Sequence, residues 1–328
     1  MLLTQYIIAI IGGFIVLVWG ADRFVYGAAG TARNIGVSTL VIGLTVVGFG
    51  TSAPEILVSV MAALEGSPGI AVGNAIGSNI ANIALVLGVT ALVSPLLVNS
   101  KILKREFPIM LFAMFVALFL LYDLQLSWID GLILMSGIVA FTFWLIKISK
   151  GKDNDPSLQQ EFETEIPHIP LKKAILWTLA GLVLLLISSQ ILVYGAVNIA
   201  KYFGVSDLII GLTIIAIGTS LPELATSVMS AIKKEHDMAI GNIIGSNMFN
   251  LLAVLGIPAM LVSPIPLTAE VISRDYMMML GLSIVLFIFA YGFRGPGRIN
   301  RIEGGLLLLA YFAYMGTLYM SVAATHST

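Results

Sequence analysis

Long apolar segments alternate with short polar ones along almost the whole chain of 328 residues. About 20 consecutive apolar residues are enough for a helix to span a bilayer. The pattern predicts ten such spans, at residues 2–22, 39–64, 69–94, 106–122, 127–147, 172–197, 207–232, 238–262, 273–292 and 302–322. The most polar stretch, 149–170, falls between the fifth and sixth spans and predicts a solvated linker. We therefore expect an all-α integral membrane protein of about ten transmembrane helices, with halves at 1–148 and 171–328.

Composition supports this fold class. Only 11% of the residues are charged and 58% are hydrophobic, whereas a soluble domain has roughly 25% charged residues. The chain has no cysteine, which excludes disulfides and thiolate metal sites. No Lys or Arg precedes Arg23, so the first segment lacks the basic start of a signal peptide, and we expect it to be a retained helix.

The basic residues are distributed unevenly between alternate loops. Fifteen of the 17 Lys and Arg residues, Arg23 and Arg33 among them, fall on one side of the predicted spans, and only Lys201 and Arg274 fall on the other. By the positive-inside rule the rich side is cytoplasmic, which places both termini outside. We expect a multi-pass protein of the inner (plasma) membrane whose partner is the lipid bilayer and not nucleic acid. The sequence leaves the oligomeric state open.

The two halves share sequence. Gly36–Leu64 recurs as Gly204–Ile232 with 17 of 29 positions identical, and Gly73–Asn82 recurs as Gly241–Asn250, both after 168 residues. Five spans in each half is an odd number, so equivalent helices must cross the membrane in opposite directions. Such inverted-topology repeats occur in secondary transporters, whose binding sites lie near the midplane between the repeats.

Each half carries one Gly-Thr-Ser-x-Pro-Glu segment within an apolar span. Pro54 has no N–H, so the carbonyl of Gly50 loses its helical donor. Within a membrane such a break is tolerated where the freed carbonyls line a cavity or find other partners. Thr51 and Glu55 are four residues apart and share one helix face. The second copy repeats the arrangement with Gly218, Thr219, Pro222 and Glu223.

The second motif block places a serine and an asparagine four residues apart in each half, as Ser78 with Asn82 and Ser246 with Asn250. Its other asparagines, Asn74, Asn79, Asn242 and Asn247, are typical of helix packing with interhelical hydrogen bonds.

Together the motifs offer roughly six to eight hard oxygen donors, which suit Ca²⁺, and Na⁺ uses the same donors. Transition metals prefer imidazole or thiolate, and the three histidines fall in predicted loops. Two ionised glutamates balance one Ca²⁺ or two protons. A glutamate pair held neutral for packing alone is the structural alternative, but two carboxylates on proline-broken helices favour an ion.

The paired motif blocks resemble the two α-repeats of the Ca²⁺/cation antiporter superfamily, with prokaryotic Na⁺/Ca²⁺ exchanger-like proteins as the nearest members. The resemblance implies four sites in a diamond. Its calcium ligands would be Glu55 and Glu223 with the carbonyls of Thr51 and Thr219. Its sodium ligands would be Ser52, Ser220, Ser78, Ser246 and the carbonyls of Gly48 and Ala216. Asn82 and Asn250 would take the middle position, and the first and sixth spans would slide across the core.

Related sodium-coupled proteins often carry aspartate at the position of Asn250, so this chain has one carboxylate fewer. The expected function is exchange of Ca²⁺ for Na⁺ by alternating access, and a Ca²⁺/H⁺ antiporter is the alternative. No prosthetic group is expected. An intramembrane protease would need a His-Glu-x-x-His motif or paired intramembrane aspartates, which are absent from the sequence. A cation channel would differ from an exchanger because its flux would need no ion on the far side.

Overall fold

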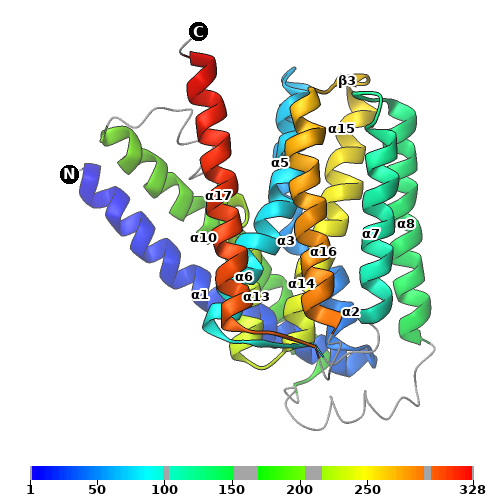
Figure 1. The fold of residues 1–328 in the computed structure, drawn as a ribbon. Coiled ribbons are helices and arrows are strands. Elements are labelled where there is room, and N and C mark those ends of the chain that lie inside the picture. Colours follow the sequence, from blue (N-terminus) through cyan, green and yellow to red (C-terminus); the bar gives the residue numbers. More distant parts are fainter. Residues whose placement is uncertain (1, 99–102, 151–168, 204–215, 292–296, 327–328) are drawn as a thin grey trace.

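The computed structural model describes residues 2–98, 103–150, 169–203, 216–291 and 297–326 (Figure 1). The first half contains α1 (Leu2–Ile35), α2 (Thr39–Ile42), η1 (Gly43–Val47), α3 (Gly48–Thr51), α4 (Ala53–Leu64), α5 (Pro68–Ile80), η2 (Ala81–Val86), α6 (Leu87–Val93), β1 (Leu96–Val98), α7 (Leu103–Leu120), β2 (Gln125–Leu126) and α8 (Trp128–Lys150). The second half contains α10 (Leu171–Tyr202), α12 (Ala216–Thr219), α13 (Leu221–Ile232), α14 (His236–Phe249), η4 (Asn250–Val254), α15 (Leu255–Leu261), β3 (Ile265–Pro266), η5 (Val271–Tyr276), α16 (Met277–Tyr291), β4 (Gly297–Ile299) and α17 (Arg301–His326). The η segments are π-helical.

Helices dominate the described residues, as predicted. Seven continuous helical segments are long and apolar enough to cross a membrane, and the bent pair Thr39–Thr51 and Ala53–Leu64 makes up to eight. The fourth predicted span corresponds to α7, which is 18 residues long and has three charged residues in its first turn. The seventh predicted span begins outside the described residues. The count of ten therefore stays a prediction.

Several boundaries differ from those predicted. Helix α1 continues to Ile35, so Arg23 and Arg33 lie within a helix and not in a loop. His236 begins α14 and His326 ends α17, so neither lies in the predicted loops. Both helices continue past the apolar stretch because a helix can extend beyond the hydrocarbon wherever its backbone hydrogen bonds continue. The four short strands were not predicted, and most of the predicted linker, residues 151–168, lies outside the described residues.

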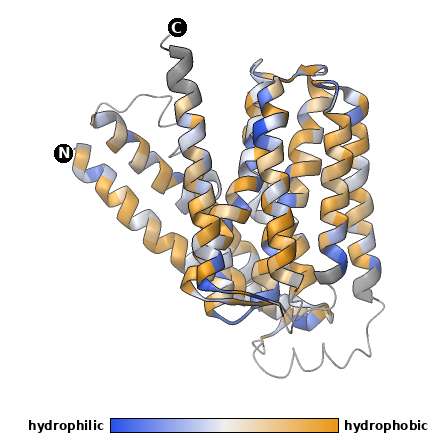
Figure 2. Ribbon diagram, in the orientation of Figure 1, coloured by the Kyte–Doolittle hydropathy of each residue, from blue (hydrophilic) through white to orange (hydrophobic). Residues whose placement is uncertain are grey.

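Two helical segments form the centre of the bundle. Of the best apolar windows in each, 89% of the residues are buried in His236–Leu261 and 72% in Pro68–Val93, against 28% or less in the other five. The peripheral helices turn apolar side chains outward, such as Phe119 at 78% and Ile302 at 77% exposure. Figure 2 shows these outer helices as predominantly hydrophobic along their length. Such a surface fits hydrocarbon as its surroundings.

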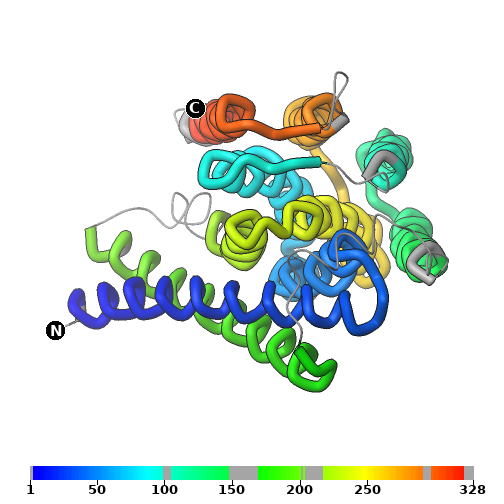
Figure 3. Tube along the Cα trace, turned by 90° about the horizontal axis from the view of Figure 1, so that it is seen from below, coloured from blue at the N-terminus to red at the C-terminus, as the bar shows by residue number. Residues whose placement is uncertain are grey.

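Helices α1 and α10 form a separate layer on one side of this bundle, where they cross each other (Figure 3). A Cβ on Gly27 would lie 2.8 Å from the carbonyl oxygen of Ala174, and one on Gly195 would lie 2.8 Å from that of Tyr6. Gly195 follows Gly27, and Ala174 follows Tyr6, by the same 168 residues. The two helices therefore make the same close contact twice.

The short strands pair between the two halves. Strand β1 pairs antiparallel with β4, with Leu96 opposite Ile299, and β2 pairs antiparallel with β3, with Leu126 opposite Ile265. The β2–β3 pair lies at the upper end of the molecule in Figure 1, beside the β3 label, and β1 and β4 run together at the lower end. Each pair joins the entry or exit of a helix in one half to that of a helix in the other.

Substitution of Gly181 tests the crossing of α1 and α10. A Cβ there would lie 2.5 Å from the backbone N of Phe24, so Gly181→Ala must force the helices apart. We expect a loss of about 1–3 kcal/mol, typical of overpacking, measured as a lower thermal unfolding midpoint in detergent. Gly281→Ala is the control, because no described atom lies within 4 Å of its Cβ position. Equal midpoints for the two variants would contradict the contact.

Candidate functional site

The predicted break in the second span is confirmed. Helix α3 ends at Thr51, α4 begins at Ala53, and the two helical stretches meet at an angle of 41°. Pro54 lies in the first turn of α4, where its missing N–H costs no helical hydrogen bond. Glu55 follows in the same turn, and α13 places Glu223 at the same position. The N-terminus of a helix favours negative charge, so both carboxylates lie where the helix dipole stabilises them.

Glu55 and Glu223 are both fully buried and close enough to repel each other electrostatically. The Ser52 hydroxyl donates to Oε1 of Glu223 at 3.4 Å. Neither carboxylate oxygen of Glu55, nor Oε2 of Glu223, has a hydrogen-bond partner among the described residues. Two buried carboxylates without a compensating positive charge are unfavourable, so these oxygens are suited to a cation.

Neutral oxygen donors surround the pair. The hydroxyl of Ser220, both side-chain polar atoms of Asn250 and Oδ1 of Asn82 are buried and lack partners within the described part of the chain. Asn82 donates through Nδ2 to Oδ1 of Asn247 at 3.2 Å. Asn82 is the second residue of η2, and Asn250 is the first of η4. Single π-helical turns inside α-helices occur frequently at functional sites.

The predicted interhelical asparagine hydrogen bonds are also present. Asn74 donates to the carbonyl of Glu55 at 3.1 Å and to Ser59 Oγ at 2.9 Å. Asn242 donates to the carbonyl of Glu223 at 3.3 Å, and to the hydroxyl of the matching Ser227 at 2.8 Å. Each asparagine thus holds the backbone of the glutamate in its own half. The sequence reasoning did not single out the two serines, although both recur at the common displacement of 168 residues.

One side of the pair is tightly closed. Thr51 donates to Oδ1 of Asn242 at 3.1 Å and its hydroxyl lies 3.3 Å from that of Ser246, which itself donates to the carbonyl of Gly48 at 3.4 Å. A Cβ on Gly245 would lie 2.5 Å from the carbonyl oxygen of Leu44. Helix α14 therefore lies in backbone contact with η1 and α3, and leaves no room for an ion path between them.

The other side of the pair opens into a cavity of about 360 Å³. Asn74, Ser78 and Thr219 line it, together with Gly73 and Gly77, which would accept a Cβ without meeting a described atom within 4 Å. The segment equivalent to η1 in this half, residues 211–215, lies outside the described residues. The cavity walls also include η5 and α17, and η5 lies at the upper end in Figure 1, beside β3.

The expected site residues divide between these surroundings. Thr51, Ser52, Ser220, Ser246, Asn82, Asn250 and the two glutamates are buried around the helix breaks. Ser78 and Thr219 line the cavity, Gly48 begins α3 and Ala216 begins α12. The structure brings residues of both halves together, as the repeat predicts, but it distributes them unequally between a closed side and an open one.

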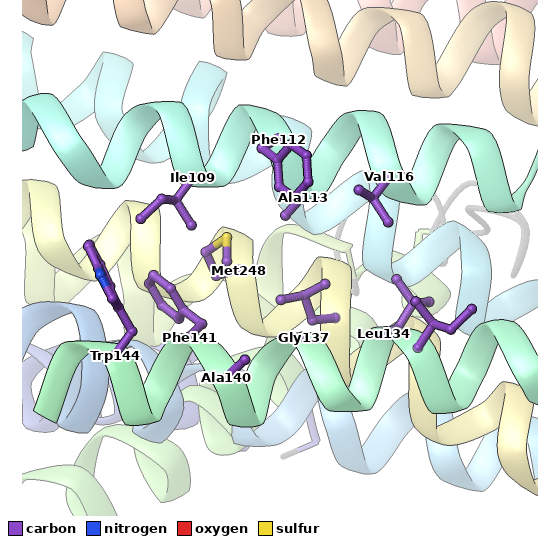
Figure 4. Close-up of a pocket in the computed structure, with 12 residues that line it drawn as sticks. Ile109, Phe112, Ala113, Val116, Leu134, Gly137, Ala140, Phe141, Trp144 and Met248 are labelled. Carbon is purple, nitrogen blue, oxygen red and sulfur yellow. The ribbon is translucent and has the colours of Figure 1, made fainter. Parts of the chain in front are cut away.

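A second pocket, of about 320 Å³, lies between α7 and α8 and reaches Met248 of α14 (Figure 4). Its labelled lining is apolar, with Phe112, Phe141 and Trp144 as the largest groups. Such a lining suits hydrocarbon and offers nothing to a cation. No group of three or more His, Cys, Asp or Glu occurs within the described residues, which agrees with a site made of two carboxylates and neutral oxygens.

Comparison with known proteins decides the family. The family model described as "Sodium/calcium exchanger protein" matches residues 5–147 and 173–320. The chain belongs to the sodium/calcium exchanger family. It is therefore a cation/Ca²⁺ antiporter of the membrane and not an enzyme, and the resemblance drawn from the paired motifs is confirmed.

Relatives of this exchanger family match over nearly the whole chain. CaxA, a proposed antiporter of Alkalimonas amylolytica, is 46% identical over 315 residues, covering 96% of this chain and 98% of its own. Inner membrane protein YrbG of Escherichia coli is 41% identical and covers 94% and 95%. A solved structure of the sodium–calcium exchanger NCX_Mj superposes with a TM-score of 0.82 at 33% identity, covering 96% of this chain and 98% of that one.

The asparagine brackets provide a test of the closed and open sides. Asn242→Ala would leave the buried hydroxyls of Thr51 and Ser227 without a partner, at a cost of about 1–3 kcal/mol for each. Asn74 lines the cavity, where water can replace its hydrogen bonds. We therefore expect Asn242→Ala to lower the thermal unfolding midpoint more than Asn74→Ala. A larger loss for Asn74→Ala would contradict the assignment of the two sides.

Proposed function

We propose that the protein exchanges Ca²⁺ for Na⁺ by alternating access at a site between the two helix breaks. The observation that carries this proposal is the pair of buried glutamates, one from each half, whose carboxylate oxygens lack protein partners. The name of NCX_Mj, and that of the Methanosarcina acetivorans relative MaX1, a sodium/calcium exchanger 30% identical over 356 residues, support Na⁺ as the counter-ion.

The ligand chemistry follows from the oxygen donors. Ca²⁺ would bind Glu55 and Glu223 with the carbonyls of Thr51 and Thr219, because two carboxylates neutralise its charge and Ca²⁺ accepts several oxygen ligands. Sodium ions would use the hydroxyls and carbonyls on either side, from Ser52, Ser220, Ser78, Ser246, Gly48 and Ala216. Asn82 and Asn250 would take the middle position. Since the sites share oxygens, Ca²⁺ and Na⁺ would exclude each other.

We further propose that the two halves are inverted repeats of five helices each. Three sets of contacts support a pseudo-two-fold relation: the paired strands at opposite ends, the reciprocal glycine contacts of α1 and α10, and the asparagine brackets of the two glutamates. In each set the partners exchange roles between halves. The α1 N-terminus and the α17 C-terminus lie at the same end in Figure 1, and we assign that end to the outside from the distribution of basic residues.

The unequal halves suit alternating access. In the structure the cavity side of the pair is open and the α14 side is closed. An inverted repeat can adopt the opposite state by giving each half the conformation of the other. The mutual packing of α1 and α10, outside the central bundle, would let them slide as a unit while the helices that hold the glutamates stay in place.

Substitution of either glutamate tests the site. Glu55→Gln or Glu223→Gln keeps the shape of the side chain but removes the charge that balances Ca²⁺. We expect Ca²⁺ exchange in proteoliposomes to fall below about 1% of wild type, with no lower thermal unfolding midpoint, because an uncompensated buried charge is lost. Glu65→Gln, at the exposed end of α4, is the control and should retain exchange. Exchange at more than a tenth of wild type in either central variant would refute the assignment.

The coupling ion is tested separately. Asn250 leaves two carboxylates at the site, a number that two protons could also neutralise, so Ca²⁺/H⁺ exchange is the alternative. We expect radioactive Ca²⁺ to accumulate in proteoliposomes that carry an outward Na⁺ gradient at uniform pH. Accumulation only with an outward H⁺ gradient would overturn Na⁺ coupling. Ca²⁺ flux without any ion on the far side would indicate a channel.

A further inference from the structure

Two acidic residues outside the central site occupy matching positions in the two halves. Arg105-Glu106-Phe107 lies in the first turns of α7, and Arg274-Asp275-Tyr276 ends η5, 169 residues later. The same displacement relates Ser94-Pro95 to Ser263-Pro264. Helix α7 begins at the lower end of the molecule in Figure 1, whereas η5 lies at the upper end. The two carboxylates therefore lie towards opposite ends.

Asp275 lies in the wall of the cavity that leads to the central site, and Asn74 and Thr219 line the same space. Its side chain is 14% exposed. Arg274 donates from Nε to Oδ1 at 2.7 Å and from Nη2 to Oδ2 at 3.0 Å, and the hydroxyl of Tyr314 in α17 donates to Oδ1 at 2.9 Å. Among the described lining residues, Asp275 carries the one carboxylate.

The matching surface in the other half is collapsed. The displacements that relate the segments carry the cavity lining onto Thr51, Gly241, Asn242, Gly245, Ser246, Glu106, Ile138, Phe141 and Leu145. Glu106, like Asn242 and Ser246, is fully buried, and the glycines lie in backbone contact with η1 and its neighbours. Asp275 and Glu106 thus differ as the two sides differ: one faces a cavity and the other is enclosed.

Resting on the proposed function, we propose that Asp275 is an entry site for Ca²⁺ from the end at which the cavity opens, and that Glu106 serves the opposite end when the other side opens. A carboxylate in a narrow cavity with apolar walls concentrates cations and raises their rate of arrival by about 10-fold or more. Asp275 is the first charged group of the wall, and the central glutamates lie beyond Ser78 and Thr219.

Arg274 makes this entry site a weak one. Its guanidinium occupies both oxygens of Asp275, so an arriving cation must displace it. The side chain of Arg274 is 33% exposed and is attracted to the exposed Glu270 one turn earlier, which offers the displaced guanidinium another partner. Hydrogen bonds from its own backbone N–H and from the Thr268 hydroxyl hold the pKa of Glu270 below its ordinary value, so it stays charged. An entry site must bind ions weakly enough to pass them on.

Side-specific kinetics test the inference. The chain has no cysteine, so Met315→Cys, in the cavity wall, lets an impermeant thiol reagent silence only those molecules whose cavity faces the reagent. In that background, Asp275→Asn should raise the KM for Ca²⁺ about tenfold at the cavity end at low ionic strength, with the maximal rate and the opposite-end KM unchanged. Glu106→Gln should show the reverse pattern. Choline chloride should reduce both effects because it screens the charge.

Conservative variants separate entry from folding. Asp275→Glu should restore the wild-type KM, Glu270→Gln should change it less than twofold, and Arg274→Gln should lower it, a change opposite in sign to that of Asp275→Asn. An unchanged KM in Asp275→Asn, or an equal rise at both ends, would overturn the entry site while leaving the central site intact. Absence of exchange in the wild type, or full activity of Glu55→Gln, would instead refute the proposed function on which the inference rests.

Discussion

The burial of two carboxylates in an apolar bundle is the constraint on which the rest of the structure depends. Glu55 and Glu223 repel each other, and burial deprives both of water. The surrounding features compensate: each carboxylate lies at a helix N-terminus, each glutamate backbone is bracketed by an asparagine, and hydroxyls and amides complete the surroundings. These groups reduce the cost but supply no positive charge. A cation in the site completes the electrostatics, so the same constraint that shapes the fold makes the protein an ion carrier.

Glycine determines how that site is closed. Backbone contact between η1 and α14 depends on glycines on both sides, since a Cβ on Gly43 would lie 2.7 Å from the carbonyl oxygen of Met238 and one on Gly241 would lie 2.7 Å from that of Leu40. Close backbone approach of this kind is how helices associate within membranes, where apolar side chains gain little by leaving lipid. Because few hydrogen bonds are added at the contact, it can form and separate without leaving many polar groups unsatisfied. The residues that permit closure thus also keep it reversible.

Much of this arrangement could be predicted from the sequence, and the failures have physical causes. Periodic hydrophobicity located the apolar helices, and Pro54 located the break because a missing N–H acts locally. The length of α1 was underestimated because polar residues such as Arg23 end a hydrophobic run without ending a helix. The entry carboxylates were missed for a similar reason: Asp275 lies at a predicted span end, where a charge needs no special explanation. Only its cavity, and its match with Glu106, distinguish it.

The repeat explains why one half is open while the other is closed. Both halves share one site, so opening both sides at once would give a continuous pore, and closing both would occlude the ion. Near-equivalent sequences make the two one-sided states similar in free energy, which a carrier requires, since a gap of only a few kcal/mol leaves the minor state populated. Positions at which the halves differ then set the balance. Tyr314 donates to Asp275, but its counterpart Phe141 has no hydroxyl to offer Glu106. Because the hydroxyl holds Asp275 in the cavity wall, this difference favours the state in which the cavity is open at the Asp275 end.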